Sequence, residues 1–99
     1  MKDMHWYEEN IEEELHDAEK YAKSALYTKH TDAEASRLCA ELARQELNHA
    51  DMLHGMAVKT YNRHADAGED MTATKAIWDH YHKKAVEQRA KVHALLAGL

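Results

Sequence analysis

The middle of this chain reads LARQELNHA, from Leu42 to Ala50. Residues three apart on a helix share a face, so Glu46 and His49 point the same way. If that face is the apolar one, the helix buries a carboxylate and an imidazole side by side. Unpaired ions are costly in such a position, and a divalent metal ion is a common compensation. The orientation of this pair therefore bears on both the packing and the chemistry of the protein.

Composition places the chain in the all-helical class. The 99 residues include no proline and three glycines, and alanine, leucine, glutamate, lysine and histidine are prominent. These residue types favour helices, and the alternation of valine, isoleucine and threonine that is typical of strands is absent. The length allows one small domain. We therefore expect a single all-α domain over residues 1–99.

Charge and cysteine content narrow the cellular setting. The formal net charge is −5, which argues against nucleic acid as a partner. The single cysteine, Cys39, has no partner for an internal disulfide and fits a reducing cytosol. No apolar run is long enough to span a membrane, and residues 1–7 lack the apolar core of a signal peptide. The expected location is cytoplasmic, away from membranes.

The sequence predicts three helices. The first covers about residues 5–28, the second runs from Thr31 to about residue 62, and the third covers about residues 72–96. Thr31 and Glu34 have the spacing of a capping box, with Thr31 as the N-cap. Gly55 lies inside the second helix at a cost of about 1 kcal/mol relative to alanine, and it marks a bend or a close approach. Residues 63–70 contain the expected loop.

Each predicted helix has an inward stripe of mainly apolar residues at three- and four-residue steps. The first stripe contains Tyr7, Ile11, Glu14, Leu15, Ala18, Tyr21, Ala22 and Ala25. The second contains Ala35, Leu38, Cys39, Leu42, Glu46, His49, Met52, Leu53 and Met56, followed by Val58 or Thr60. The third contains Thr74, Ile77, Trp78, Tyr81, Ala85, Gln88, Val92, Leu95 and Leu96, and no carboxylate.

Glu-x-x-His occurs twice, and helical phase separates the two copies. Glu13 and His16 fall off the stripe of the first helix, where a solvated face is the simpler interpretation. Glu46 and His49 fall on the stripe of the second helix. The other histidines His54, His80, His82 and His93 are expected on the surface, open to weak and adventitious metal binding.

A third candidate ligand is placed by the geometry of the helical hairpin. Glu14 lies 16 residues before His30, near the turn, and Glu46 lies 16 residues after it. Two antiparallel helices that meet near His30 therefore bring Glu14 to the height of Glu46 and His49. Two carboxylates and one imidazole suit iron, manganese or zinc better than calcium or magnesium.

A hairpin alone leaves such a site open on one side. A two-fold dimer would close it into a four-helix bundle whose interior holds four glutamates and two histidines. That is the ligand set of di-iron carboxylate proteins: one glutamate from each of two helices, and Glu-x-x-His from each of the other two. The sequence thus predicts a homodimer or a higher homo-oligomer with iron between its subunits, manganese and zinc being the alternative metals.

Residues 14–22 and 41–50 resemble the ferritin-like superfamily, and within it the rubrerythrin-like proteins. The first of these segments has a glutamate, Glu14, with an aromatic residue, Tyr21, about two turns later. The second has Glu46-x-x-His49-Ala50, with Glu46 32 residues after Glu14. The resemblance covers about half of the chain, and it implies that Glu14, Glu46 and His49 are metal ligands with a role in oxidation.

The chain departs from a full rubrerythrin-like domain in two respects. It has three predicted helices rather than four, and it lacks the Cys-x-x-Cys pair of a rubredoxin-like iron site. The half-length plan resembles encapsulated ferritins, which assemble a di-iron site between two subunits. The resemblance therefore implies Fe(II) binding and oxidation by O₂ or peroxide, as a ferroxidase or peroxidase.

Two other interpretations fit the same residues. The chain could be a metal-free helical interaction module, with Glu14 and Glu46 exposed or paired with basic side chains. It could also hold one zinc ion within a single chain, in a structural role. Neither needs a dimer to complete the site.

Overall fold

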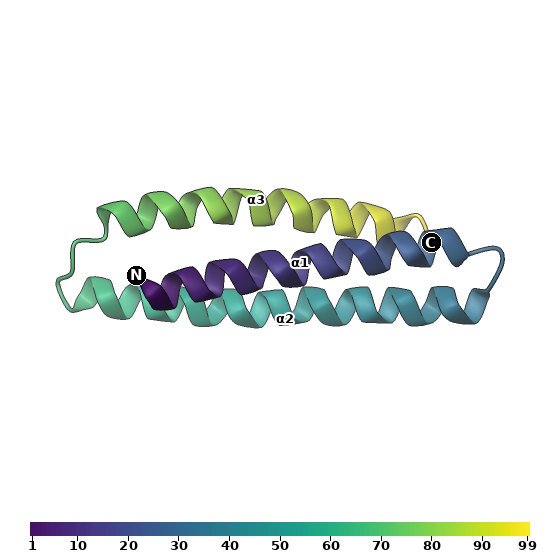
Figure 1. Ribbon diagram of the computed structural model, residues 1–99, viewed down its shortest axis with the longest axis horizontal. Helices are drawn as coiled ribbons and strands as arrows, with labels where there is room; N and C mark the ends of the chain where they lie inside the picture. The colour runs from purple at the N-terminus through teal and green to yellow at the C-terminus, as the bar shows by residue number, and fades with distance from the viewer.

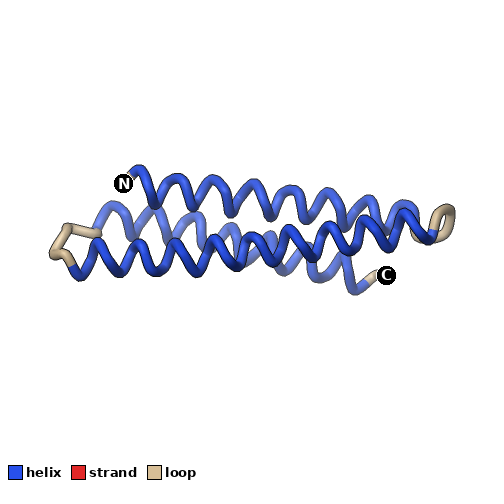
Figure 2. Tube along the Cα trace, turned by 90° about the horizontal axis from the view of Figure 1, so that it is seen from below, coloured by secondary structure: helices blue, strands red, loops and turns tan.

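Three long helices form an elongated antiparallel bundle of 56 × 17 × 17 Å (Figure 1). The computed structural model describes all residues 1–99. Helix α1 spans Lys2–Thr28, α2 spans Ala33–Asp66 and α3 spans Thr72–Ala97. Figure 2 shows helices joined by two short connections, with no strand. The all-α prediction is confirmed, and no helix has the length and hydropathy that crossing a bilayer requires.

The helix ends differ in detail from those expected. Asp32, and not Thr31, is the N-cap of α2, and its carboxylate accepts a hydrogen bond from the Ala35 N–H at 3.0 Å. Asp32 takes the N-cap position because its side chain is one residue closer to the first turn and reaches a free N–H of that turn. Helix α2 continues four residues past the expected end and passes Gly55 without a break. Nothing lies within 4 Å of the position of a Cβ at Gly55, so no close approach explains it.

The connection between α2 and α3 is short, because α2 extends into the expected loop. Gly68 adopts a φ of +83°, a left-handed conformation that glycine reaches without strain. Asp70 then accepts hydrogen bonds from the backbone N–H and the hydroxyl of Thr72, at 3.0 and 2.7 Å. These contacts turn the chain back so that α3 runs antiparallel to α2.

Helix α1 is the central element of the packing. It contacts α2 along its length and α3 over a smaller area, whereas α2 and α3 barely touch each other. Small side chains line the α1–α2 contact and let the two backbones approach closely. The fully buried alanines are Ala18, Ala22, Ala25, Ala43 and Ala57. Helix α3 joins this core through Val92, with Trp78, Ala85, Leu95 and Leu96 around it.

The inward face of α2 differs from the predicted stripe. Its buried residues are Ser36, Ala40, Ala43, Leu47, Ala50, Ala57 and Thr60. Leu38, Met52 and Met56, expected inside, are exposed. On α3, Ile77 is likewise exposed rather than buried. The face is rotated because close helix packing selects small side chains, whereas the sequence pattern was weighted toward large apolar ones.

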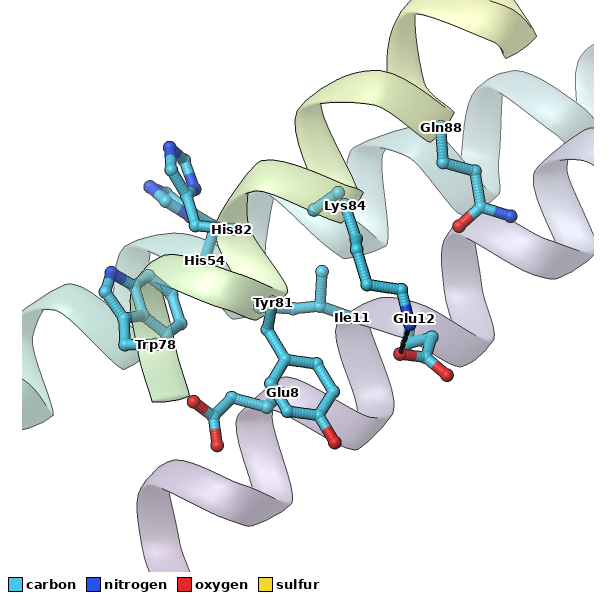
Figure 3. Close-up of a pocket in the computed structure, with 10 residues that line it drawn as sticks. Glu8, Ile11, Glu12, His54, Trp78, Tyr81, His82, Lys84 and Gln88 are labelled. Atoms are coloured by element: carbon cyan, nitrogen blue, oxygen red, sulfur yellow. Dashed lines mark ion pairs between the residues drawn. The ribbon is translucent and has the colours of Figure 1, made fainter. Parts of the chain in front are cut away.

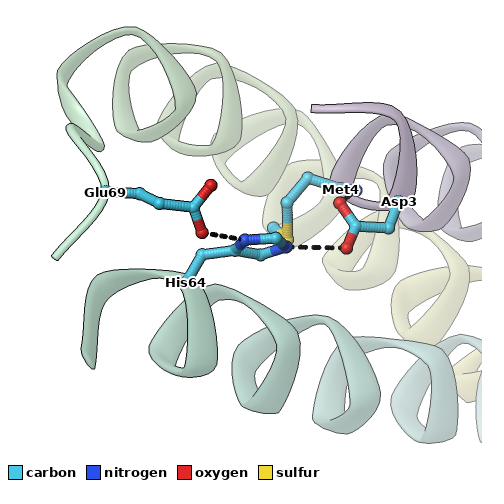
Figure 4. Close-up of polar contacts among 4 residues, drawn as sticks. All are labelled: Asp3, Met4, His64 and Glu69. Atoms are coloured by element: carbon cyan, nitrogen blue, oxygen red, sulfur yellow. Dashed lines mark hydrogen bonds and ion pairs between the residues drawn. The ribbon is translucent and has the colours of Figure 1, made fainter. Parts of the chain in front are cut away.

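One polar contact joins three segments at the end of the bundle that contains the N-terminus. His64, near the end of α2, lies between Asp3 of α1 and Glu69 of the α2–α3 connection (Figure 4). Its Nε2 is 2.7 Å from an oxygen of Asp3, and its Nδ1 contacts Glu69. Hydrogen bonding to the two carboxylates raises the pKa of His64. This histidine clasp needs the doubly protonated imidazolium, because only that form donates from both nitrogens.

Candidate metal centre

The three predicted ligands meet near the middle of the α1–α2 hairpin. Glu14 comes from α1, and Glu46 and His49 come from adjacent turns of α2. Each side chain offers one donor atom, and these atoms all lie within 4.8 Å of one another. His49 Nδ1 is 3.6 Å from Glu14 Oε2 and 3.9 Å from Glu46 Oε2. The three groups meet because Glu14 and Glu46 are equally far along the chain from the turn of the hairpin.

These separations suit a shared cation better than direct hydrogen bonds. Both exceed the range of a hydrogen bond between nitrogen and oxygen, about 2.7–3.2 Å. Donor atoms that each lie about 2.0–2.2 Å from one metal ion are about 3–4 Å apart. The His49 nitrogen and the two carboxylate oxygens therefore need little movement to bind one ion.

One oxygen of Glu14 lacks a hydrogen-bond donor. Glu14 Oε2 is buried, and no group of the protein donates a hydrogen bond to it. A buried acceptor without a donor costs about 1–3 kcal/mol, and more when the group is charged. A metal ion would satisfy this oxygen, and His49 Nδ1 is the nearest ligand partner. The donor set, two carboxylates and an imidazole, fits iron, manganese or zinc.

The group is open on one side. The His49 side chain is 51% exposed and that of Glu14 27%, so the prediction that His49 lies on a buried stripe is wrong for the single chain. Helix α3 does not cover the group. It pairs with the opposite side of α1, through Lys84 with Glu12 at 3.5 Å. A metal ion held by these three side chains would keep coordination positions free on the side that faces solvent.

The second Glu-x-x-His pair behaves as predicted for a solvated face. Glu13 and His16 are both exposed, and no third ligand joins them in a group that could hold a metal ion. The pair therefore provides a matched comparison for Glu46 and His49, with the same spacing and residue types on the same hairpin but without convergence.

Two features escaped the sequence prediction. Glu8 of α1 is buried, although its spacing from Met4 and Ile11 follows the core pattern of α1 and could have revealed it. His54 of α2, expected on the surface, is half-buried beside Trp78 and His82 of α3 (Figure 3). That cluster has no sequence signal, because it depends on how α3 is placed against α2. The same region contains a small cavity of about 30 Å³ whose lining includes Glu8, Trp78 and Tyr81.

Comparisons with protein families, with curated proteins and with solved structures find no match to this chain. The observation with most chemical content is the convergence of Glu14, Glu46 and His49 around an unpaired carboxylate oxygen.

Proposed function

We propose that two copies of this chain pair through the open face of the α1–α2 hairpin and form a di-iron carboxylate site. Each copy contributes Glu14, Glu46 and His49, so the paired site has four carboxylates and two imidazoles. The observation that carries the proposal is the convergence of these three donors beside a buried, unpaired oxygen of Glu14. The proposed activity is binding of Fe(II) and its oxidation by O₂ or peroxide.

The surface around the group supports a second copy as its cover. Leu38, Met52 and Met56 are exposed on α2, and at 100° per residue they share the His49 side of that helix. Exposed apolar side chains on the same side of α2 as the ligand group are groups that a partner surface would cover. A second copy placed there would remove them from water and would bring a second set of three ligands to the first. One surface thus accounts for both the apolar stripe and the open ligand group.

Charge balance supports two divalent ions per pair. Four ionised carboxylates in a closed bundle repel one another strongly, and two divalent cations cancel their charge. Bound iron supplies the redox chemistry, while the protein supplies position and charge. Glu14 and Glu46 hold the negative charge from opposite helices, so that ion binding fixes the distance between α1 and α2. His49 offers Nδ1 from the open side and completes the set with a neutral donor.

Anaerobic loading with Fe(II), followed by metal analysis and air, tests the proposal. We expect one iron per chain, two per dimer, and a di-ferric absorption band after air is admitted. Glu46→Ala combined with His49→Ala removes two of the three ligands and should abolish both. Glu13→Ala combined with His16→Ala changes the same residue types on the solvated face and should leave both intact.

Thermal unfolding gives an independent measure. Iron bound to the folded dimer should raise the melting temperature, because it relieves carboxylate repulsion and binds only the native state. Identical melting curves with and without a chelator would contradict the proposal, as would full iron binding in the Glu46/His49 variant. Binding of one zinc ion by a monomer, without an oxidation band, would instead favour the mononuclear zinc site that the exposed His49 also permits.

A further inference from the structure

The seam between α2 and α3 is the weakest contact of the bundle, and few side chains cross it. The two helices barely touch, because each packs mainly on α1. Arg89 of α3 holds Asp51 of α2 with two hydrogen bonds of 2.5 and 2.9 Å. One turn farther along α2, His54 meets Trp78 and His82 of α3. These two contacts are therefore the main side-chain links across the seam.

The second link is a cluster of three aromatic rings. The ring centres of His54 and His82 are 5.2 Å apart, and Trp78 lies 5.5 Å from His54 and 5.9 Å from His82. Figure 3 shows both imidazoles on the same side of the ribbons, beside the indole of Trp78. With nitrogen–metal bonds of about 2.0–2.1 Å, two imidazoles in adjacent positions on one ion have ring centres about 5 Å apart. The spacing of His54 and His82 matches that arrangement.

The surroundings keep His54 available as a donor. Burial, and then the nearby His82, lower the pKa of His54, the direction that favours its uncharged form. Asp51 contributes negative charge close to His54, although Arg89 holds its carboxylate. A cation between the two rings would thus lie close to the imidazoles of His54 and His82 and to a carboxylate.

The remaining charged groups around the cluster do not compete for the same position. Lys84 lines the cavity on the α1 side of α3, where its ammonium lies 3.5 Å from Glu12. Glu8 extends into that cavity from α1 and is buried. The side of the cluster that faces solvent carries His82, which is exposed, and the one basic side chain that lines the groove there, Arg89, is paired with Asp51.

We propose that His54 and His82 form a two-histidine site for Cu²⁺ or Zn²⁺ that fastens α3 to α2. These ions favour imidazole nitrogen, whereas the Glu14, Glu46 and His49 group offers mostly carboxylate oxygen. The two sites lie on different faces of α2, since His54 is five residues beyond His49. The bound metal links α2 and α3, the two helices with the least contact, and water completes its coordination.

Trp78 provides a built-in reporter for this site. Cu²⁺ quenches tryptophan emission at short range, and the chain has two tryptophans. Trp6→Phe removes the other one and gives a parent protein in which all tryptophan emission comes from Trp78. Titration of that parent with Cu²⁺ should quench the emission at one equivalent. His54→Gln and His82→Gln should each weaken the quenching affinity by about tenfold or more, since even indirect losses at metal sites cost that much.

Two matched controls separate this site from others. His80→Gln alters an exposed histidine of α3 outside the cluster, and His49→Ala removes a ligand of the candidate metal centre. Both variants should quench as the parent does. Quenching that is unchanged by His54→Gln and His82→Gln, or equally weakened by His80→Gln, would overturn the proposal and indicate adventitious surface binding only.

Zn²⁺ gives a second measurement that does not depend on fluorescence. It should raise the melting temperature of the His49→Ala variant, in which the candidate metal centre has lost a ligand, and not that of the His49→Ala/His82→Gln double variant. In the unmodified protein, Zn²⁺ should shift the imidazole NMR signals of His54 and His82 before those of His80. If Zn²⁺ shifts all histidines together, the two-histidine site is wrong. The result is independent of iron binding at the proposed di-iron site.

Discussion

Replacement of Glu8 by methionine is expected to stabilise the protein at neutral pH. The Glu8 side chain is only 3% exposed, and its nearest basic group, His5 Nδ1, is 3.9 Å away. Its Oε2 receives no hydrogen bond. Burial raises the pKa of Glu8, the direction expected when a carboxylate loses water and gains no donor. The native state therefore carries the cost of an unpaired polar group inside the bundle.

The size of the effect follows from that cost. A buried polar group without a partner costs about 1–3 kcal/mol. Methionine keeps the length and flexibility of glutamate and removes both oxygens. We expect Glu8→Met to raise the free energy of unfolding at pH 7 by about 1–2 kcal/mol, and the melting temperature by about 5–15 °C for a domain of this size.

The pH dependence has a defined sign. A carboxyl group whose pKa is raised by folding leaves the native state fully stable below its unfolded pKa, about 4.3, and that stability is lost as the pH rises through the folded pKa. The advantage of Glu8→Met should therefore be largest at neutral pH and smaller near pH 4. Urea or thermal unfolding followed by circular dichroism at both pH values measures it.

The neighbouring residue gives the control. Glu9 is exposed and lies 3.0 Å from His5. Glu9→Met should change stability by no more than about 0.5 kcal/mol, as is usual for surface substitutions. The reasoning is refuted if Glu8→Met destabilises the protein at pH 7, or if its gain is as large at pH 4 as at pH 7.

Three further predictions follow from other contacts. The histidine clasp stabilises the fold fully below the unfolded pKa of His64, about 6.5, and its contribution is lost as the pH rises through the raised folded pKa. His64→Gln should therefore lower the melting temperature at pH 6 and have less effect at higher pH. Asp32→Ala removes the N-cap of α2 and should cost about 1 kcal/mol in unfolding experiments, whereas Thr31→Ala should cost less. Met52→Lys should convert the proposed dimer to monomer in sedimentation experiments, whereas Val58→Lys, a change of another exposed residue on a different side of α2, should not.

The number of helices, and the antiparallel arrangement of the first two, could be predicted from sequence because the relevant physics is local. The absence of proline, the caps and the glycine of the second connection act within a few residues of one another. The height of Glu14 relative to Glu46 follows from the rise of a helix and the position of one turn. These features need no knowledge of what each helix packs against.

The rotation of α2 and the His54–Trp78–His82 cluster could not be predicted in this way, because both depend on tertiary contacts. A stripe of alanines and a stripe of larger residues lie side by side on α2, and periodicity alone does not decide which one faces α1. Close packing against the alanines of α1 favours Ala43 and Ala50, and this turns Met52 and Met56 outward. Glu8 differs from these residues, because its spacing from Met4 and Ile11 does match the core pattern of α1. A charged side chain is rarely expected inside, however, so the spacing alone did not identify Glu8 as buried.

The difference between the predicted and the observed inward face of α2 has a physical explanation if the protein is a dimer. The predicted stripe combined residues that face α1 with residues that face solvent in the single chain, and Glu46 and His49 lie across that border. In a monomer, the outer residues are an exposed apolar row beside an open ligand group. In a paired bundle they would be interior, as their hydrophobicity predicts, and the unpaired oxygen of Glu14 would lie within a closed site. Oligomeric state and metal binding are then coupled, because the surface that would bury the row is the same surface that would complete the ligand set.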